Sequence, residues 1–100
     1  MTVQMYVLYR TPENPEAFEK RYVEGHLPLI KAYDNVKDVS FAKVTRRVMG
    51  EFPYDYVFTG TWSDKDAWKA DLGSQKAKDA TADAQSFAPP FDVVVLETLA

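Results

Sequence analysis

Val3-Gln4-Met5-Tyr6-Val7-Leu8-Tyr9-Arg10 is a run of strand-forming residues whose two alternating sets are both largely apolar or aromatic. Successive side chains of a strand point to opposite faces of its sheet, so this strand needs cover on both faces. The run from Phe91 to Leu99 has the same property, because Val93-Val94-Val95-Leu96 places apolar side chains on both faces. The sheet that contains these strands is therefore expected to be covered on both sides.

A helix is predicted after the first strand. Asn14 is a good N-cap, and Pro15 suits the first helical position. Gly25 and Pro28 disfavour a regular helix, so we expect a break or kink near Gly25 and a looser segment from Pro28 to Tyr33. Before and across this break, four side chains recur at four-residue spacing on one side of the helix: Phe18, Tyr22, His26 and Ile30.

Two more strands are predicted at 36–48 and 54–62, joined by a turn that contains Gly50 and Pro53. A helix capped by Ser63 follows and stops at Gly73, and a second helix begins at Ser74. Two sets of side chains share a face, one on the third strand and one on the last helix: Tyr54, Tyr56, Phe58, Gly60 and Trp62, and Ala77, Ala80, Ala84 and Phe87. The order predicts one ferredoxin-like βαββαβ domain of the α+β class, residues 1–100, with a four-stranded antiparallel sheet and its helices on one face.

Helices in this topology leave the other face of the sheet open. Because the first and last strands are apolar on both faces, the open face needs a partner, and a homodimer formed through the sheet provides it.

Composition excludes several classes of protein. The 100 residues contain no cysteine and one histidine, which excludes a disulfide scaffold, thiolate metal sites and a closed zinc shell built on imidazoles. No metal site is expected. There is no apolar run long enough to span a membrane and no signal-peptide pattern at the start, so we expect a cytoplasmic protein without a membrane partner.

His26 is the one side chain that ordinarily titrates near neutrality, and the predicted helix break places it beside an apolar wall. Tyr9, Tyr22 and Tyr33 are expected to join it around one cavity between helices and sheet. A purely structural alternative stays open: His26 caps the bend by donating to a backbone carbonyl, and the aromatic side chains only pack.

Nucleic-acid binding is an alternative use of the same topology. Tyr6 and the aromatic third strand loosely resemble the base-stacking strands of an RNA-recognition motif. However, the motif's Lys/Arg-Gly pair is missing and the net charge is −3, so we expect no nucleic-acid partner.

A strand that ends in Tyr9-Arg10 is followed by Phe18 and Tyr22, which lead into His26-Leu27-Pro28-Leu29. This segment resembles the EthD family, named for ethyl tert-butyl ether degradation. The Trp62-Ser63 step into a helix and the Ala-rich stretch up to Phe87 are similar too. The resemblance implies a dimeric α+β barrel with a pocket between sheet and helices in each protomer, and His26 matches the family's histidine. No cofactor is implied; haem with His26 as axial ligand is a variant.

Two functional hypotheses follow. In the first, the protein binds and transforms a small hydrophobic or aromatic metabolite, with His26 as the catalytic acid–base group or hydrogen-bond donor and four ligand-binding residues: Tyr9, Tyr22, Tyr33 and Phe18. In the second, it is a non-catalytic dimeric module that binds a ligand or assists an enzyme of a degradation pathway. A His26 ring that faces a cavity favours the first hypothesis, and a ring tied to backbone at both nitrogens favours the second.

Overall fold

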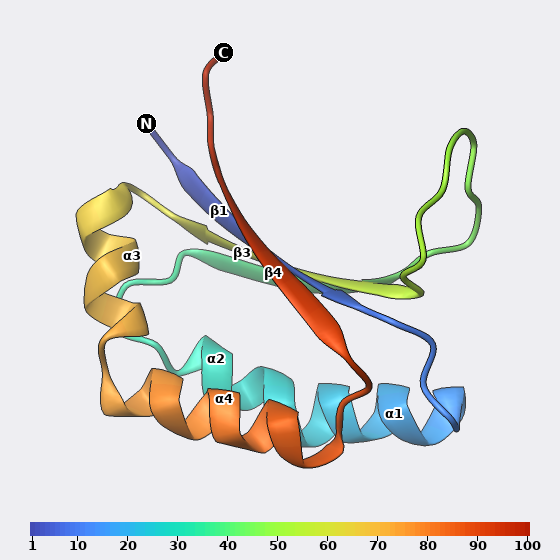
Figure 1. The fold of residues 1–100 in the computed structure, drawn as a ribbon. Helices are drawn as coiled ribbons and strands as arrows, with labels where there is room; N and C mark the ends of the chain where they lie inside the picture. The colour runs from blue at the N-terminus through green and yellow to red at the C-terminus, as the bar shows by residue number, and fades with distance from the viewer.

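The chain follows the predicted βαββαβ order in a computed structural model that describes residues 1–100 (Figure 1). The strands form one antiparallel sheet in the order β2-β3-β1-β4, and the helices lie together on one of its faces. This confirms the ferredoxin-like architecture. The elements are β1 (Val3–Tyr9), α1 (Pro15–Arg21), a π-helical segment η1 (Tyr22–His26), α2 (Leu27–Lys31), β2 (Asp38–Lys43), β3 (Tyr56–Trp62), α3 (Lys65–Leu72), α4 (Gln75–Phe87) and β4 (Phe91–Glu97).

The core lies between the sheet and the helices. Alternate residues of the two central strands are buried there, and the register pairs Val7 of β1 with Phe58 of β3. The predicted shared face of β3 is confirmed for Tyr56, Phe58 and Trp62, which are buried, whereas Tyr54 lies before the strand and is only partly buried. The helix layer contributes two predicted rows of side chains to the core, and the following members are buried: Phe18, Tyr22, His26 and Ile30 in one row, and Ala77, Ala80 and Ala84 in the other.

Gly60 leaves room for the ring of Trp62. A Cβ at this position would lie 2.8 Å from Cη2 of Trp62, which is fully buried and unable to move aside. We expect Gly60→Ala to lower the free energy of unfolding by about 1–3 kcal/mol, the usual effect of overpacking a core. Gly73→Ala is the matched control, because its nearest new contact would be an ordinary 3.4 Å. Urea denaturation of both variants checks this, and equal losses would contradict it.

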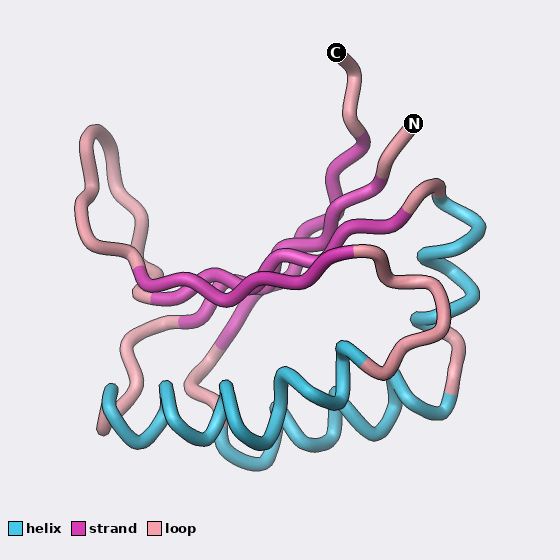
Figure 2. Tube along the Cα trace, turned by 180° about the vertical axis from the view of Figure 1, so that it is seen from behind, coloured by secondary structure: helices cyan, strands magenta, loops and turns pink.

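The opposite face of the sheet has no covering element (Figures 1 and 2). By strand alternation and register it carries Tyr6 and Leu8 of β1, Val57 of β3, and Val94 and Leu96 of β4. Val94 and Leu96 are 45% and 42% exposed. An apolar face of this kind remains open in a single copy of the chain, as the sequence predicted.

Strands β2 and β3 are shorter than predicted, because residues 44–55 leave the sheet as an arm. The arm projects on the side away from the helices (Figure 1). Arg47 holds its two halves together by donating to the backbone oxygens of Phe52 and Tyr54 and to the carboxylate of Asp55. Backbone pairing ends at the base of the arm, where the amide of Val44 donates to the carbonyl of Asp55, and beyond it these side-chain bonds replace the predicted strand ladder.

Two predictions about helix geometry need correction. Near Gly25, where a break or kink was predicted, the helix becomes irregular but does not end: a π-helical turn from Tyr22 to His26 joins α1 directly to α2, with the amide of Leu27 donating to the carbonyl of Tyr22. The segment after the turn, predicted to be looser, is α-helical from Leu27 to Lys31. The wider turn absorbs Gly25 and the missing donor of Pro28 without ending the helix. Asp64, one residue after the predicted Ser63, caps α3 by accepting from the amide of Ala67. No helix in the structure has both the length and the apolar character to cross a membrane.

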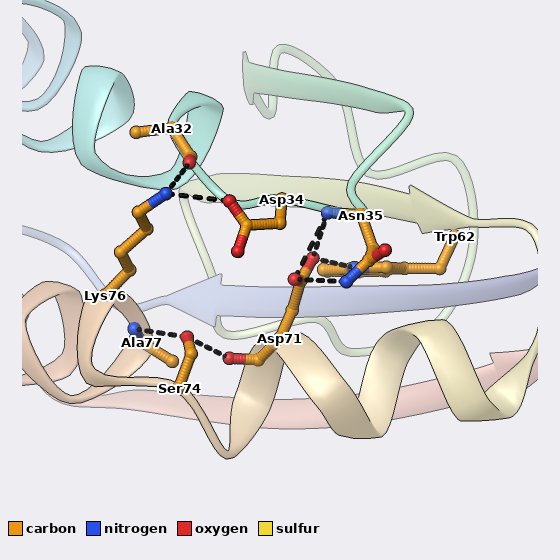
Figure 3. Close-up of polar contacts among 8 residues, drawn as sticks. All are labelled: Ala32, Asp34, Asn35, Trp62, Asp71, Ser74, Lys76 and Ala77. Atoms are coloured by element: carbon orange, nitrogen blue, oxygen red, sulfur yellow. Dashed lines mark hydrogen bonds and ion pairs between the residues drawn. The ribbon is translucent and has the colours of Figure 1, made fainter.

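A buried carboxylate joins three parts of the fold (Figure 3). Asp71 of α3 is 2% exposed and accepts hydrogen bonds from the indole Nε1 of Trp62, at 2.7 Å, and from the backbone and side-chain nitrogens of Asn35. Nothing in the sequence pattern predicted this role. The carboxylate fixes the loop between α2 and β2 against α3 and the end of β3.

Candidate functional site

A cavity of about 140 Å³ lies between the helices and the sheet. His26 is its one ionisable lining residue apart from tyrosines, and the rest of the wall is almost wholly apolar. The lining residues are Met5, Val7, Tyr9, His26, Ile30, Tyr33, Phe58, Leu72, Ala80, Thr81, Ala84, Phe91 and Val93. The cavity therefore combines an apolar body with one imidazole.

Asp83 of α4 holds the His26 ring. Nδ1 of His26 lies 2.9 Å from Oδ2 of Asp83, while Arg21 donates from Nη2 to Oδ1 of the same carboxylate at 2.5 Å and from Nη1 to Oδ2 at 3.3 Å. A carboxylate only accepts, so Nδ1 of His26 carries the hydrogen and donates. No protein group bonds the other ring nitrogen, Nε2. Every fully enclosed side-chain nitrogen or oxygen has a hydrogen-bond partner except Nε1 of Trp68. Because Nε2 of His26 has no partner and is not among these enclosed atoms, it is accessible.

Burial and charge set the protonation state of this group. Burial of the ring, which is 3% exposed, lowers the pKa of His26 and outweighs the opposing influence of the Asp83 carboxylate. The hydrogen bond from Arg21 holds the pKa of Asp83 below its ordinary range. At neutral pH the site thus contains a neutral imidazole, its Nδ1 hydrogen on an ionised carboxylate and a lone pair on Nε2.

The protonation state gives a pH test. Because the folded protein lowers the pKa of His26 below its ordinary 6.5, the unfolded chain binds more protons once the pH falls through that value. The free energy of unfolding should therefore fall between pH 7.5 and 5 in the wild type, and fall less in His26→Phe. Asp83 and Arg21, which face the ring, do not titrate in this window. Urea titrations at the two pH values, at one protein concentration, measure the slopes; equal slopes would contradict the assignment.

Gly25 is part of the same arrangement. A Cβ on Gly25 would lie 2.5 Å from Nη1 of Arg21, so the absence of a side chain lets the guanidinium lie over the π-helical turn and reach Asp83. The guanidinium also sits 4.3 Å above the ring of Phe87. The glycine that suggested a helix break is thus explained by the arginine that crosses it.

The tyrosines around His26 keep their protons at neutral pH. The hydroxyls of Tyr9 and Tyr22 share a hydrogen bond of 2.9 Å. Burial raises the pKa of Tyr9 to about 12 and raises the pKa of Tyr22 as well, so both stay protonated at neutral pH. Burial also raises the pKa of Tyr33, whose hydroxyl has no hydrogen bond within the protein.

The structure brings together only part of the predicted site. Tyr9, Tyr33 and His26 line one cavity, as expected. Tyr22 does not line it, because its fully buried ring stacks on Phe41 at 3.8 Å. Phe18 does not line it either and contributes instead to a separate groove between the β1–α1 loop and the end of α4.

The contacts of Asp83 and Arg21 with the His26 site were not predicted from the sequence. Asp83 lies 57 residues from His26 and is one of two acidic residues on an alanine-rich helix. Its position beside Ala84 and one turn after Ala80, on the buried stripe of α4, was the one available signal. No group of three or more histidine, aspartate or glutamate side chains is arranged to hold a metal ion.

No protein-family model and no curated protein matches this chain. Among solved structures, an EthD family protein from Bacillus halodurans C-125 superposes with a TM-score of 0.89 at 23% identity, over 99% of this chain and 100% of that chain. The chain has the fold of an EthD family protein. The resemblance inferred from the sequence is thus confirmed at the level of the fold.

Two other solved structures share this EthD-like fold. One is described as a dimeric ferredoxin-like protein of unknown function from Thermobifida fusca YX, with a TM-score of 0.73 at 17% identity over 98% of this chain and 92% of that chain. The other is SnoaB, described as a cofactor-independent oxygenase from Streptomyces nogalater, with a TM-score of 0.70 at 12% identity over 97% and 92%. At such identities the likeness establishes the fold alone.

Proposed function

We propose that the protein binds and transforms a small hydrophobic or aromatic molecule in the cavity between sheet and helices, with His26 as the acid–base group. One observation carries the proposal: the single imidazole of the chain lines an apolar cavity with Nδ1 held by Asp83 and Nε2 free. A buried, oriented histidine with one open nitrogen is the arrangement that proton transfer requires. A ring bound at both nitrogens would instead have supported the non-catalytic module.

The proposed chemistry needs no cofactor in the cavity. SnoaB, which shares the fold, is described as cofactor-independent. Haem does not fit: a cavity of about 140 Å³ is far too small to enclose the macrocycle with His26 as axial ligand. The proposal therefore has a neutral imidazole accept a proton at Nε2 and return it there, while Asp83 stabilises the imidazolium formed in between.

The same proposal includes a homodimer that buries the open face of the sheet. The face carries apolar side chains on β1, β3 and β4, interspersed with Gln4, Thr59, Thr61 and Asp92, and a solved structure with this fold is described as dimeric. Each copy keeps its own cavity, because the cavity lies on the helix side of the sheet.

Filling the cavity tests the proposal. Ala84 lines the cavity and is buried, whereas Ala82 on the same helix is exposed and lies outside it. We expect Ala84→Leu to weaken binding of small aromatic compounds at least tenfold and to abolish any turnover, because the new side chain occupies the ligand's space. Ala82→Leu should bind as the wild type does. Saturation-transfer NMR against a panel of aromatic and alicyclic compounds measures the affinities, with thermal melts to confirm folding. Equal binding by both variants would place the ligand elsewhere.

A further inference from the structure

We infer that the cavity selects a molecule of one ring that carries a hydroxyl group donating a hydrogen bond to Nε2 of His26, as a simple phenol does. This inference rests on the proposed function and names the class of its ligand. It is carried by the size of the cavity and by the hydrogen-bonding capacity of the few polar atoms in its wall.

Size limits the ligand to one ring. An engineered apolar cavity of about 150 Å³ binds benzene, and the cavity here has about 140 Å³. Its walls are formed by Val7 and Phe58 from the sheet and by Ala80 and Ala84 from α4. A second, fused ring would have to extend through the mouth of the cavity into solvent or push these elements apart, and it would gain less burial than the first ring.

Polarity favours a ligand with an apolar body and one donor, since the wall adds only the hydroxyls of Tyr33 and Thr81 to the polar atoms of His26 and Tyr9. Nδ1 of His26 is already used on Asp83, so Nε2 offers the cavity a lone pair rather than a hydrogen. The Tyr9 hydroxyl is occupied by Tyr22. The partner of Nε2 in the cavity must therefore donate, which a hydroxyl does and an ether or ketone does not.

Charge excludes an anionic ligand. The cationic group of the site, the Arg21 guanidinium, is bound to Asp83 and does not line the cavity. A phenolate or carboxylate would enter an apolar space next to an ionised aspartate and would lose its hydration without a compensating partner. The bound form is therefore the neutral hydroxyl, with its proton shared toward Nε2. Tyr33, whose hydroxyl is free within the protein, can donate to the same ligand oxygen.

Phenol, toluene and anisole are the probes. Toluene matches phenol in size but has no donor, and anisole keeps the oxygen but replaces the hydrogen by a methyl group. Because His26 is the only histidine, its ring signals report directly on Nε2. We expect phenol to shift the Nε2 resonance and toluene and anisole to leave it nearly unchanged. We also expect the ratio of toluene to phenol dissociation constants to fall about tenfold or more in His26→Phe.

Each outcome is decisive. Equal ratios in wild type and His26→Phe, or no change at Nε2 on adding phenol, would overturn the inference while the proposed binding of apolar rings stands. Tighter binding of 1-naphthol than of phenol, lost in Ala84→Leu, would overturn the single-ring limit and leave the proposed function intact. If no compound binds in a way that depends on Ala84, the proposed function fails together with the inference. The NMR readout uses the wild type, so it does not depend on the folding of the His26 variant.

Discussion

Asp71→Asn is expected to lower the free energy of unfolding by about 1.5–3 kcal/mol, the usual cost of losing hydrogen bonds to a buried charged group. The asparagine has nearly the same shape, but one of its two terminal atoms is an NH₂ group. That group would face either the indole N–H of Trp62 or the amide nitrogens of Asn35, all of which are donors. At least one buried donor would lose its acceptor, and the loop that precedes β2 would lose its attachment (Figure 3).

Asp66→Asn is the matched control for this change. Asp66 is on the same helix, is exposed and accepts no side-chain hydrogen bond, so its replacement is expected to alter stability by about 0.5 kcal/mol or less. Both variants are measured by urea denaturation at a fixed protein concentration, because the stability of the proposed dimer would depend on concentration. If Asp71→Asn were as stable as Asp66→Asn, the Asp71 carboxylate would not be what holds the loop between α2 and β2 against α3.

Val94→Lys is expected to raise the dimer dissociation constant at least about 100-fold, which corresponds to about 2.8 kcal/mol. Val94 is on the open face of β4, opposite Tyr6 of the central strand. In a twofold dimer the change places two ammonium groups in an apolar interface without partners. In the free protomer the position is 45% exposed, so the monomer should still fold.

Val23→Lys provides the control for the dimer prediction. Val23 is 52% exposed but lies on the helix layer, away from the open face of the sheet. Sedimentation equilibrium should give about twice 11.4 kDa for the wild type and for Val23→Lys, and about 11.4 kDa for Val94→Lys at low micromolar concentration. A wild type that sediments as a monomer would contradict the proposed homodimer.

The order of elements along the chain and two of the three helix starts were predictable because they depend on local patterns. Two-residue alternation grouped Tyr56, Phe58 and Trp62 on one face of β3 without showing which face is buried. Asn14 and Ser74 cap their helices as side chains of that type do. The arm at residues 44–55 was not predicted. Its bonds run from the side chain of Arg47 to backbone oxygens, and alternation of apolar residues contains no information about such contacts.

The candidate site was predictable only in its central residue. His26 stood out because it is the sole histidine and lies near Gly25 and Pro28, which marked an irregular helix. The same two residues led to the prediction of a break or kink, since composition alone does not distinguish a wide turn from an interruption. Asp71 and Asp83 act through partners up to 57 residues away. Contacts of that range arise from the fold and leave no local pattern.

The proposed function depends on a neutral His26 ring. Its Nδ1–H donates a hydrogen bond to Asp83, and its Nε2 keeps a lone pair for a ligand in the cavity. Nitrogen-15 NMR of the wild type at pH 7 observes both ring nitrogens of the single histidine directly. We predict a protonated Nδ1 and an unprotonated Nε2, the pattern returning to that of a free histidine when Asp83 is replaced by alanine. A hydrogen on Nε2, or a doubly protonated ring at pH 7, would contradict the role assigned to His26.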